Sequence, residues 1–448
     1  MGKRTKWNRR LFTALILSGG MVFSCGGQVY ADEVQAQKTT TYRTVTEVED
    51  FGPQITKVIV DLGTTVEENT VDTDTFKVLA VRIPGSEDAP IIGDHGVGYR
   101  KVTKAYISDR DGNAAEKGNY AALEMEIRPD LSFGLLLNPN MKSKHNEWIQ
   151  CRYTITQKKD IVSGSARVTG LVADIFDGGT RGLLDNFTAS AGTYDNITLH
   201  YASYAPAKDE AKHPLIIWLH GMGEGGTDGV LGIAGNKGVN FASEEIQSYF
   251  GGAYVLGPQC PTWWMEGMDS AAFGDGTSRY EKALMGLIQD YVANNPEIDE
   301  NRIYIGGASN GGYMTMLMIR DYPGYFAAAF PTCEALKDTL ITDPEIQKMK
   351  EIPIWFVAAK TDTTVPVLEY VVPTYNRLLK AGAKHVYFSL FDRVEDTSGL
   401  YKKADGTPYE YDGHWSWIYV FNNVPSEVIN GKNVTMMEWL SDQSLSKR

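Results

Sequence analysis

The chain has 448 residues, a formal net charge of −13 at pH 7 and 22% charged residues. An acidic balance of this kind argues against nucleic acid and anionic lipid as partners. The length exceeds what one hydrophobic core usually holds, so we expect two domains after an N-terminal targeting segment.

The first 31 residues are typical of an export signal. Five basic residues precede an apolar run from Leu11 to Ser24, and Val29-Tyr30-Ala31 offers a small-residue cleavage site before Asp32. The apolar run is too short for a good membrane span, and two glycines interrupt it. We therefore predict a secreted mature chain that begins at Asp32 and has no membrane span.

The four cysteines leave two alternatives open. Val22-Phe23-Ser24-Cys25 resembles a bacterial lipoprotein box, which would leave the protein anchored through a lipid on Cys25. The mature chain would keep Cys151, Cys260 and Cys333, an odd number that argues against a disulfide scaffold. Cys260 and Cys333 each follow a predicted strand, so one bond between them stays open. No Cys/His spacing suggests zinc, and we expect neither a metal nor a cofactor.

Residues 32–158 show a hydrophobic period of two. Turn-forming residues such as Asp111-Gly112-Asn113 separate the alternating runs, and helical periodicity is scarce. The runs are ITKVIVDLG, DTFKVLAVRI, KVTKAYISD, AALEMEIRP and WIQCRYTITQ. Short strands at this spacing predict a small all-β immunoglobulin-like sandwich. We expect this domain to hold none of the catalytic residues.

The pattern changes after residue 158. Residues 159–192 are rich in Gly, Ser and Asp, and we interpret them as a connector. In 193–448, apolar strands such as PLIIWL and IPIWFVAA alternate with amphipathic helices such as SRYEKALMGLIQDYV. Such alternation predicts a mainly parallel sheet covered by helices on both faces, so the fold class of this second domain is α/β.

Ser309 lies where a predicted strand meets a predicted helix. The strand RIYIGGAS ends at Ser309, and a helix is expected over 310–322, before Pro323. Gly307 and Gly311 stand two residues before and two after the serine, in the pattern G-x-S-x-G. A nucleophile elbow requires this strand–turn–helix context and these two glycines. The alternative is an ordinary glycine-rich loop.

A serine hydroxyl needs a base to take its proton and a carboxylate to orient that base. Asp362 stands on the exit loop of the predicted strand IPIWFVAA, and His414 lies in the later loop YDGHWSW. The order Ser, Asp, His is the one expected for this fold. His385 begins a strand, and Asp392 ends one, so they are the weaker candidates for base and acid.

A tetrahedral intermediate also needs two preorganised N–H donors for its oxyanion. We expect one from the backbone of Asn310 and the other from Met222 in the loop after PLIIWL, with Gly223 as the second choice. Three tryptophans on presumed catalytic-side loops are predicted to contact substrate, and Trp415 belongs to the same loops. They are Trp263, Trp264 and Trp417.

Five segments in chain order carry a resemblance to a known family: HGMGEGG, GPQCP, GGASNGG, AAKTDTTVP and GHWSW. The chain resembles secreted EstA-type esterases of the α/β-hydrolase fold, which carry an immunoglobulin-like N-terminal domain. Those are similar to polyhydroxybutyrate depolymerase-like and prolyl-oligopeptidase-like hydrolases. The resemblance implies Ser309 as nucleophile, His414 as base and Asp362 as its orienting acid.

The expected function is cleavage of a small-molecule or polymer-linked carboxylic ester through an acyl-enzyme. Two alternatives stay open: a secreted serine peptidase of the prolyl-oligopeptidase-like group, and a carbohydrate-binding protein with an inactive hydrolase domain. The sequence fixes neither the acyl and alcohol groups nor the oligomeric state.

Overall fold

The computed structural model describes residues 38–91, 96–269 and 271–448, which belong to one compact unit. The predicted signal segment 1–31, its cleavage site before Asp32 and the alternative lipid anchor at Cys25 lie outside the described residues. Within the described ranges, every helix is too short or too polar to cross a membrane.

The first half of the chain forms an eight-stranded sheet with the order β4-β3-β9-β12-β1-β2-β6-β5. The predicted alternation is confirmed: in β3, for example, Phe76, Val78 and Ala80 are buried, and the residues between them are more exposed. The eight strands are β1 (Lys38–Glu49), β2 (Gly52–Glu67), β3 (Phe76–Ile83), β4 (Val97–Arg100), β5 (Val102–Ser108), β6 (Lys117–Met125), β9 (Gln150–Gln157) and β12 (Leu171–Thr180). Two short hairpins extend from it, β7 (Leu137–Pro139) with β8 (Asn146–Trp148) and β10 (Ile161–Ser163) with β11 (Ala166–Val168).

The segment interpreted as a connector, 159–192, is more structured than expected. It contains β10, β11 and β12, and β12 pairs in parallel with β1 and antiparallel with β9. Leu171 and Ala173 of β12 are buried in the core of this first sheet, which explains the pairing. The first sheet therefore continues past residue 158 to Thr180.

The second half contains another eight-stranded sheet, in the order β13-β14-β16-β15-β17-β18-β19-β20. Every pairing from β16 through β15 to β20 is parallel, whereas β14 pairs antiparallel with β13 and β16. The predicted mainly parallel sheet is thus confirmed. The strands are β13 (Thr188–Tyr194), β14 (Ile197–Tyr204), β15 (His213–Leu219), β16 (Tyr254–Gln259), β17 (Ile298–Ala308), β18 (Ala328–Thr332), β19 (Ile354–Ala359) and β20 (Val386–Phe391).

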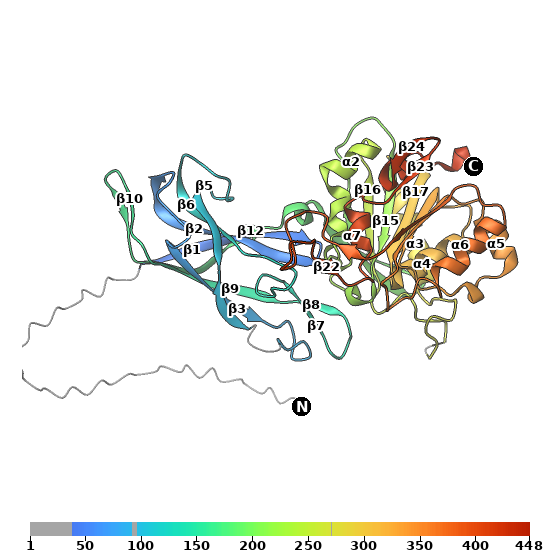
Figure 1. The fold of residues 1–448 in the computed structure, drawn as a ribbon, viewed down its shortest axis with the longest axis horizontal. Coiled ribbons are helices and arrows are strands. Elements are labelled where there is room, and N and C mark those ends of the chain that lie inside the picture. The colour runs from blue at the N-terminus through green and yellow to red at the C-terminus, as the bar shows by residue number, and fades with distance from the viewer. Residues whose placement is uncertain (1–37, 92–95, 270) are drawn as a thin grey trace, which may run out of the picture. The chain divides into compact units, whose positions relative to one another are not determined.

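Helices cover both faces of this second sheet (Figure 1). One face packs against α3 (Glu281–Asn294), α4 (Asn310–Asp321), α5 (Asp343–Met349) and α6 (Val371–Lys380). The other packs against α1 (Leu231–Ala234), α2 (Glu244–Phe250), α7 (Trp417–Phe421) and α8 (Met436–Ser441). Because both faces are buried, the central strands are mostly apolar; every residue of β15 and of β19 is buried.

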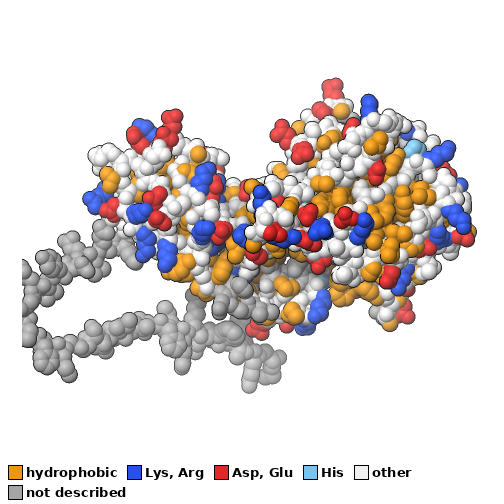
Figure 2. Space-filling view, viewed as in Figure 1, with side chains coloured by type: hydrophobic (Ala, Val, Ile, Leu, Met, Phe, Trp, Pro, Cys, Tyr) orange, Lys and Arg blue, Asp and Glu red, His pale blue; other side chains and the backbone are white. Residues whose placement is uncertain are grey.

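Two small ribbons complete the second half, β21 (Val394–Glu395) with β22 (Glu410–Tyr411) and β23 (Ser426–Ile429) with β24 (Lys432–Thr435). On the face drawn in Figure 2, acidic and basic side chains are interspersed and form no single charged patch.

Specific polar contacts connect the region of the first sheet to the region of the second sheet. Asp50, in the turn between β1 and β2, is almost completely buried and forms an ion pair with Lys237 at 2.9 Å. The side-chain amide of Asn422 also donates to Asp50, at 3.1 Å. Further along, the indole N–H of Trp148 donates to the carboxylate of Asp228. A buried charge is tolerated only with such partners, so these contacts fix where the first region meets the second.

Candidate active site

Ser309 lies in a tight turn between β17 and α4, at the carboxyl end of the parallel sheet. Its backbone has φ 57° and ψ −114°, a conformation that non-glycine residues rarely adopt. A Cβ atom at Gly311 would lie 2.0 Å from the carbonyl oxygen of Leu219, and one at Gly307 would lie 2.6 Å from the same oxygen. Neither position can carry a side chain, so the turn needs both glycines and presents the serine hydroxyl outward.

Asp362 follows β19, and its side chain is completely buried. One carboxylate oxygen, Oδ1, accepts the backbone N–H groups of Thr364 and Val365 at 2.9 and 2.8 Å. The other, Oδ2, lies 2.8 Å from Nδ1 of His414. An ionised carboxylate with these three donors is well satisfied, and a proton on Nδ1 leaves Nε2 of His414 free to accept one.

The two weaker candidates lie elsewhere. Asp392 is exposed and forms an ion pair with Lys360 at 2.6 Å, and this pair holds the pKa of Asp392 below its ordinary value. His385 is exposed just before β20. Neither residue lines the cavity that contains Ser309.

The two residues predicted to supply the oxyanion hole each begin a helical turn. Asn310 is the first residue of α4, and Met222 is the first residue of the 3₁₀ turn Met222–Glu224 that follows β15. The first N–H groups of a helix have no partner inside it. Among the described residues, no backbone hydrogen bond outside helices and strands uses either of these N–H groups as donor.

His220 holds the segment after β15 in place through two hydrogen bonds. Its Nδ1 lies 2.6 Å from the carbonyl oxygen of Gly221, and its Nε2 accepts the N–H of Cys260 at 2.9 Å. This pattern requires the neutral ring with the proton on Nδ1. Burial lowers the pKa of His220 to about 4, so the ring stays neutral at physiological pH. Sequence reasoning assigned no role to this residue.

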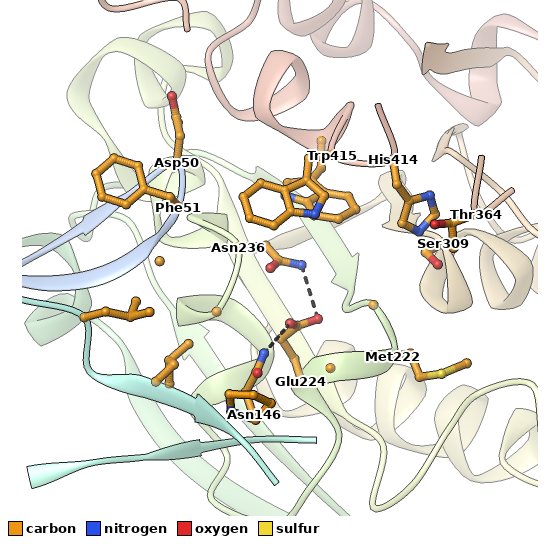
Figure 3. Close-up of a pocket in the computed structure, with 18 residues that line it drawn as sticks. Asp50, Phe51, Asn146, Met222, Glu224, Asn236, Ser309, Thr364, His414 and Trp415 are labelled. Atoms are coloured by element: carbon orange, nitrogen blue, oxygen red, sulfur yellow. Dashed lines mark hydrogen bonds between the residues drawn. The ribbon is translucent and has the colours of Figure 1, made fainter. Parts of the chain in front are cut away.

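Ser309, His414, Met222 and Thr364 line one cavity with a volume of about 410 Å³, and Figure 3 shows Ser309 beside His414. The first region of the chain supplies a second wall, which sequence reasoning missed. Its residues are Asp50, Phe51, Gly52, Leu135, Leu137, Pro139 and Asn146. The signal for this wall was the apolar run Leu135-Leu136-Leu137: Leu136 packs on the core of the first sheet, and its two neighbours line the cavity.

The predicted tryptophans separate into two groups. Trp417 lines the cavity together with Trp415, their rings are stacked at 6.0 Å, and Trp417 meets the ring of His414 edge-on at 5.6 Å. Trp263 and Trp264 do not line the cavity, contrary to the prediction. Trp264 is completely buried against His220, and Trp263 packs on the ring of His145. Both are packing residues in this structure.

Cys151, Cys260 and Cys333 are free thiols, so the disulfide left open between Cys260 and Cys333 is not formed. The thiol of Cys333 is buried beside the acid and base, with donor atoms of Cys333, Asp362 and His414 within 4.8 Å of one another. Burial raises the pKa of this thiol well above its ordinary value, which keeps it neutral.

Comparisons with known proteins agree with this architecture. Residues 41–170 match the family described as "Esterase Ig-like N-terminal domain", and residues 285–341 match the prolyl oligopeptidase family. A solved structure described as a thermostable esterase superposes with a TM-score of 0.72 at 25% identity, covering 90% of this chain and 99% of the other. A poly(3-hydroxybutyrate) depolymerase of Ralstonia pickettii is 29% identical over 132 residues, which span 29% of this chain and only 26% of that enzyme.

The chain is therefore an α/β-hydrolase preceded by an immunoglobulin-like domain, as predicted. The predicted resemblance to EstA-type esterases is confirmed by the same matches.

Proposed function

We propose that this chain is a secreted carboxylic ester hydrolase in which Ser309 is the nucleophile, His414 the general base and Asp362 its orienting acid. The observation that carries the proposal is the 2.8 Å contact between Nδ1 of His414 and Oδ2 of Asp362, made at a cavity that Ser309 also lines. The likeness to esterases supports ester chemistry over other reactions of this fold.

In the acylation step, the Oγ of Ser309 attacks the ester carbonyl carbon while its proton passes to Nε2 of His414. The carbonyl oxygen becomes an oxyanion, which accepts hydrogen bonds from the backbone N–H groups of Met222 and Asn310. The intermediate then collapses: the bond to the alcohol oxygen breaks, and His414 gives its proton to that oxygen. The products of this step are a free alcohol and an acyl group on Ser309.

In the second step, water attacks the acyl carbon and gives a proton to His414. Collapse of the second intermediate breaks the bond to Oγ, returns the proton to Ser309 and releases the carboxylic acid. Asp362 stays ionised throughout and stabilises the imidazolium. Its two backbone donors hold the carboxylate in place for this role.

The cavity walls favour an apolar or aromatic substrate group. Trp415 and Trp417 lie next to His414, and Phe51, Leu135 and Leu137 form the facing wall. Aliphatic and aromatic surfaces gain free energy by covering apolar atoms, whereas a free sugar or a charged group would lose its hydration. We therefore expect esters with an apolar acyl or aryl part.

Peptide hydrolysis is the second candidate, because residues 285–341 match the prolyl oligopeptidase family and include Ser309. The same groups serve both reactions, and only the leaving atom differs. Turnover of p-nitrophenyl butyrate against a peptide p-nitroanilide separates the two. Ester turnover at least about 100-fold above amide turnover supports the proposal, and the reverse ratio contradicts it.

The export part of the proposal has its own test. N-terminal sequencing of the protein released by its host should begin at Asp32. A lipid-modified Cys25 at the N-terminus would contradict release and support anchoring instead.

A further inference from the structure

Glu224 is a buried carboxyl group that the proposed reaction does not use. It is the last residue of the turn Met222–Glu224, whose first N–H faces the reacting carbonyl in the proposed mechanism. It is only 5% exposed, and it lines the cavity. Two glycines leave room for the side chains of Glu224 and Asn146. A Cβ at Gly235 would lie 2.5 Å from Cγ of Glu224, and a Cβ at Gly223 would lie 2.9 Å from Nδ2 of Asn146.

The carboxyl group of Glu224 is surrounded by hydrogen-bond donors (Figure 3). The side-chain amide of Asn146, from the β7–β8 hairpin of the first domain, donates to Oε1 at 3.3 Å. That of Asn236 donates to Oε2 at 3.2 Å. Gln259, the last residue of β16, also holds Glu224: its side-chain amide donates to the backbone carbonyl of Glu224 at 3.0 Å.

The carboxyl group also reaches back along its own turn. Gly221 is the residue before the turn, Glu224 is its third residue, and a Cβ added at Gly221 would lie 3.1 Å from Oε2 of Glu224. The carboxylate is therefore packed against the residue that precedes Met222, and it limits how far this turn can move.

We propose that Glu224 is a positioning residue for the oxyanion hole, and that Asn146 makes the first domain part of that support. The inference rests on the proposed ester hydrolysis. In this arrangement the ionised carboxylate is the competent form, because the side-chain amides at its two oxygens both donate to it. Protonation removes one acceptor and loosens the turn.

The charge state of Glu224 changes near neutral pH. Burial raises the pKa of Glu224 to about 7, although the bonds from Asn236 and Asn146 oppose that rise. The other titratable groups at the cavity are Asp50, which is paired with Lys237, and His414. The neutral ring of His220 is hydrogen-bonded to the carbonyl oxygen of Gly221. Activity should therefore have an ionisation on the acid side that belongs to Glu224.

The test measures kcat and KM for p-nitrophenyl acetate from about pH 5 to about pH 9 in the full-length protein, with the folded fraction counted by active-site titration. Glu224→Gln should lower kcat about 10-fold or more at high pH with KM changed less than about threefold, and should remove one ionisation from the acid limb. Asn146→Ala should move the acid limb to higher pH, because the carboxylate loses a donor that lowers its pKa. Asn138→Ala is the matched control, since its side chain donates within the first domain, to the carbonyl of Ala89 at 2.8 Å.

The outcomes are distinct. An unchanged pH profile in either Glu224→Gln or Asn146→Ala would overturn the inference, as would an equal shift in Asn138→Ala. Should Glu224→Gln fail to fold, Asn146→Ala decides alone, because it removes only one partner and leaves the carboxyl in place. Failure of the proposed function is recognised separately, by ester turnover that survives Ser309→Ala.

Discussion

The two walls of the catalytic cavity differ in how they are built. On one wall, Ser309 follows the parallel strand β17 and His414 follows β22, while Asp362, after the parallel strand β19, is buried behind His414. On the other wall, Phe51 and Leu135 come from connecting segments of the immunoglobulin-like domain, and Leu137 begins its strand β7. The first wall carries the bond-making groups in our proposal, whereas the second supplies shape and an apolar surface.

This difference separates two kinds of information in the sequence. A nucleophile elbow is a local feature, so its strand, its turn and its two glycines can be recognised in a stretch of about ten residues. The second wall depends on how one domain docks against another, and a period-two pattern reveals only which face of a strand is buried. Chemistry was therefore easier to predict here than the substrate-binding surface.

The largest expected effect comes from the first wall. Ser309→Ala and His414→Ala should each lower kcat for p-nitrophenyl butyrate by about 10⁴-fold or more, and the double variant should lose little beyond either single one. The reason is that the two groups act in one proton transfer. If the fold-losses in kcat of the two single variants multiplied in the double variant, the two residues would act independently. That result would contradict a shared proton transfer.

Asp362 should come next. Asp362→Asn keeps the size of the side chain but removes the charge that orients His414, and we expect a loss in kcat on the order of 10⁴-fold with the fold retained. The matched control is Asp392→Asn, which alters an exposed ion pair and should stay within about twofold of wild type. If the control lost activity and Asp362→Asn did not, the acid would have to be reassigned to Asp392.

The second wall should affect substrate choice more than chemistry. Replacing Leu135 and Leu137 together by alanine removes apolar contact surface, so kcat/KM should fall by about 10-fold for a butyryl ester and by much less for an acetyl ester. Equal losses for both esters would show that this wall supports the fold and does not select the acyl group.

The smallest effect on activity is expected from Glu334, a buried carboxyl after β18 that lies outside the cavity lining. Burial raises the pKa of Glu334 to about 8, so the folded protein keeps a proton that the unfolded chain releases at lower pH. The free energy of unfolding should therefore fall by a few kcal/mol as pH rises from about 4.5 to about 8.

Urea unfolding at several pH values measures this change. Glu334→Gln should make the stability less dependent on pH in that window while leaving kcat within about twofold. If the free energy of unfolding depended on pH equally in wild type and Glu334→Gln, another group would take up the proton on folding. Glu224 would be the first group to test.

Much of the fold was predictable because its signals are local. The alternating runs of the first domain and the apolar strands PLIIWL and IPIWFVAA appear as β-strands, and the elbow appears at Ser309. The pairing of β12 with β1 was missed, because that pairing joins residues more than a hundred positions apart and the Gly- and Asp-rich composition hid the alternation of Leu171 and Ala173. Trp264 was misplaced for a similar reason: composition cannot tell a tryptophan that lines a cavity from one that packs against His220.

The central claim is that Ser309 is activated by His414 at this cavity. Incubation with a fluorophosphonate followed by peptide mass spectrometry tests it most directly, since attack by an activated serine oxygen on phosphorus expels fluoride and leaves a stable adduct. We predict one modified residue, Ser309, and loss of the modification in His414→Ala. An adduct on another residue, or an equal yield without His414, would contradict the account.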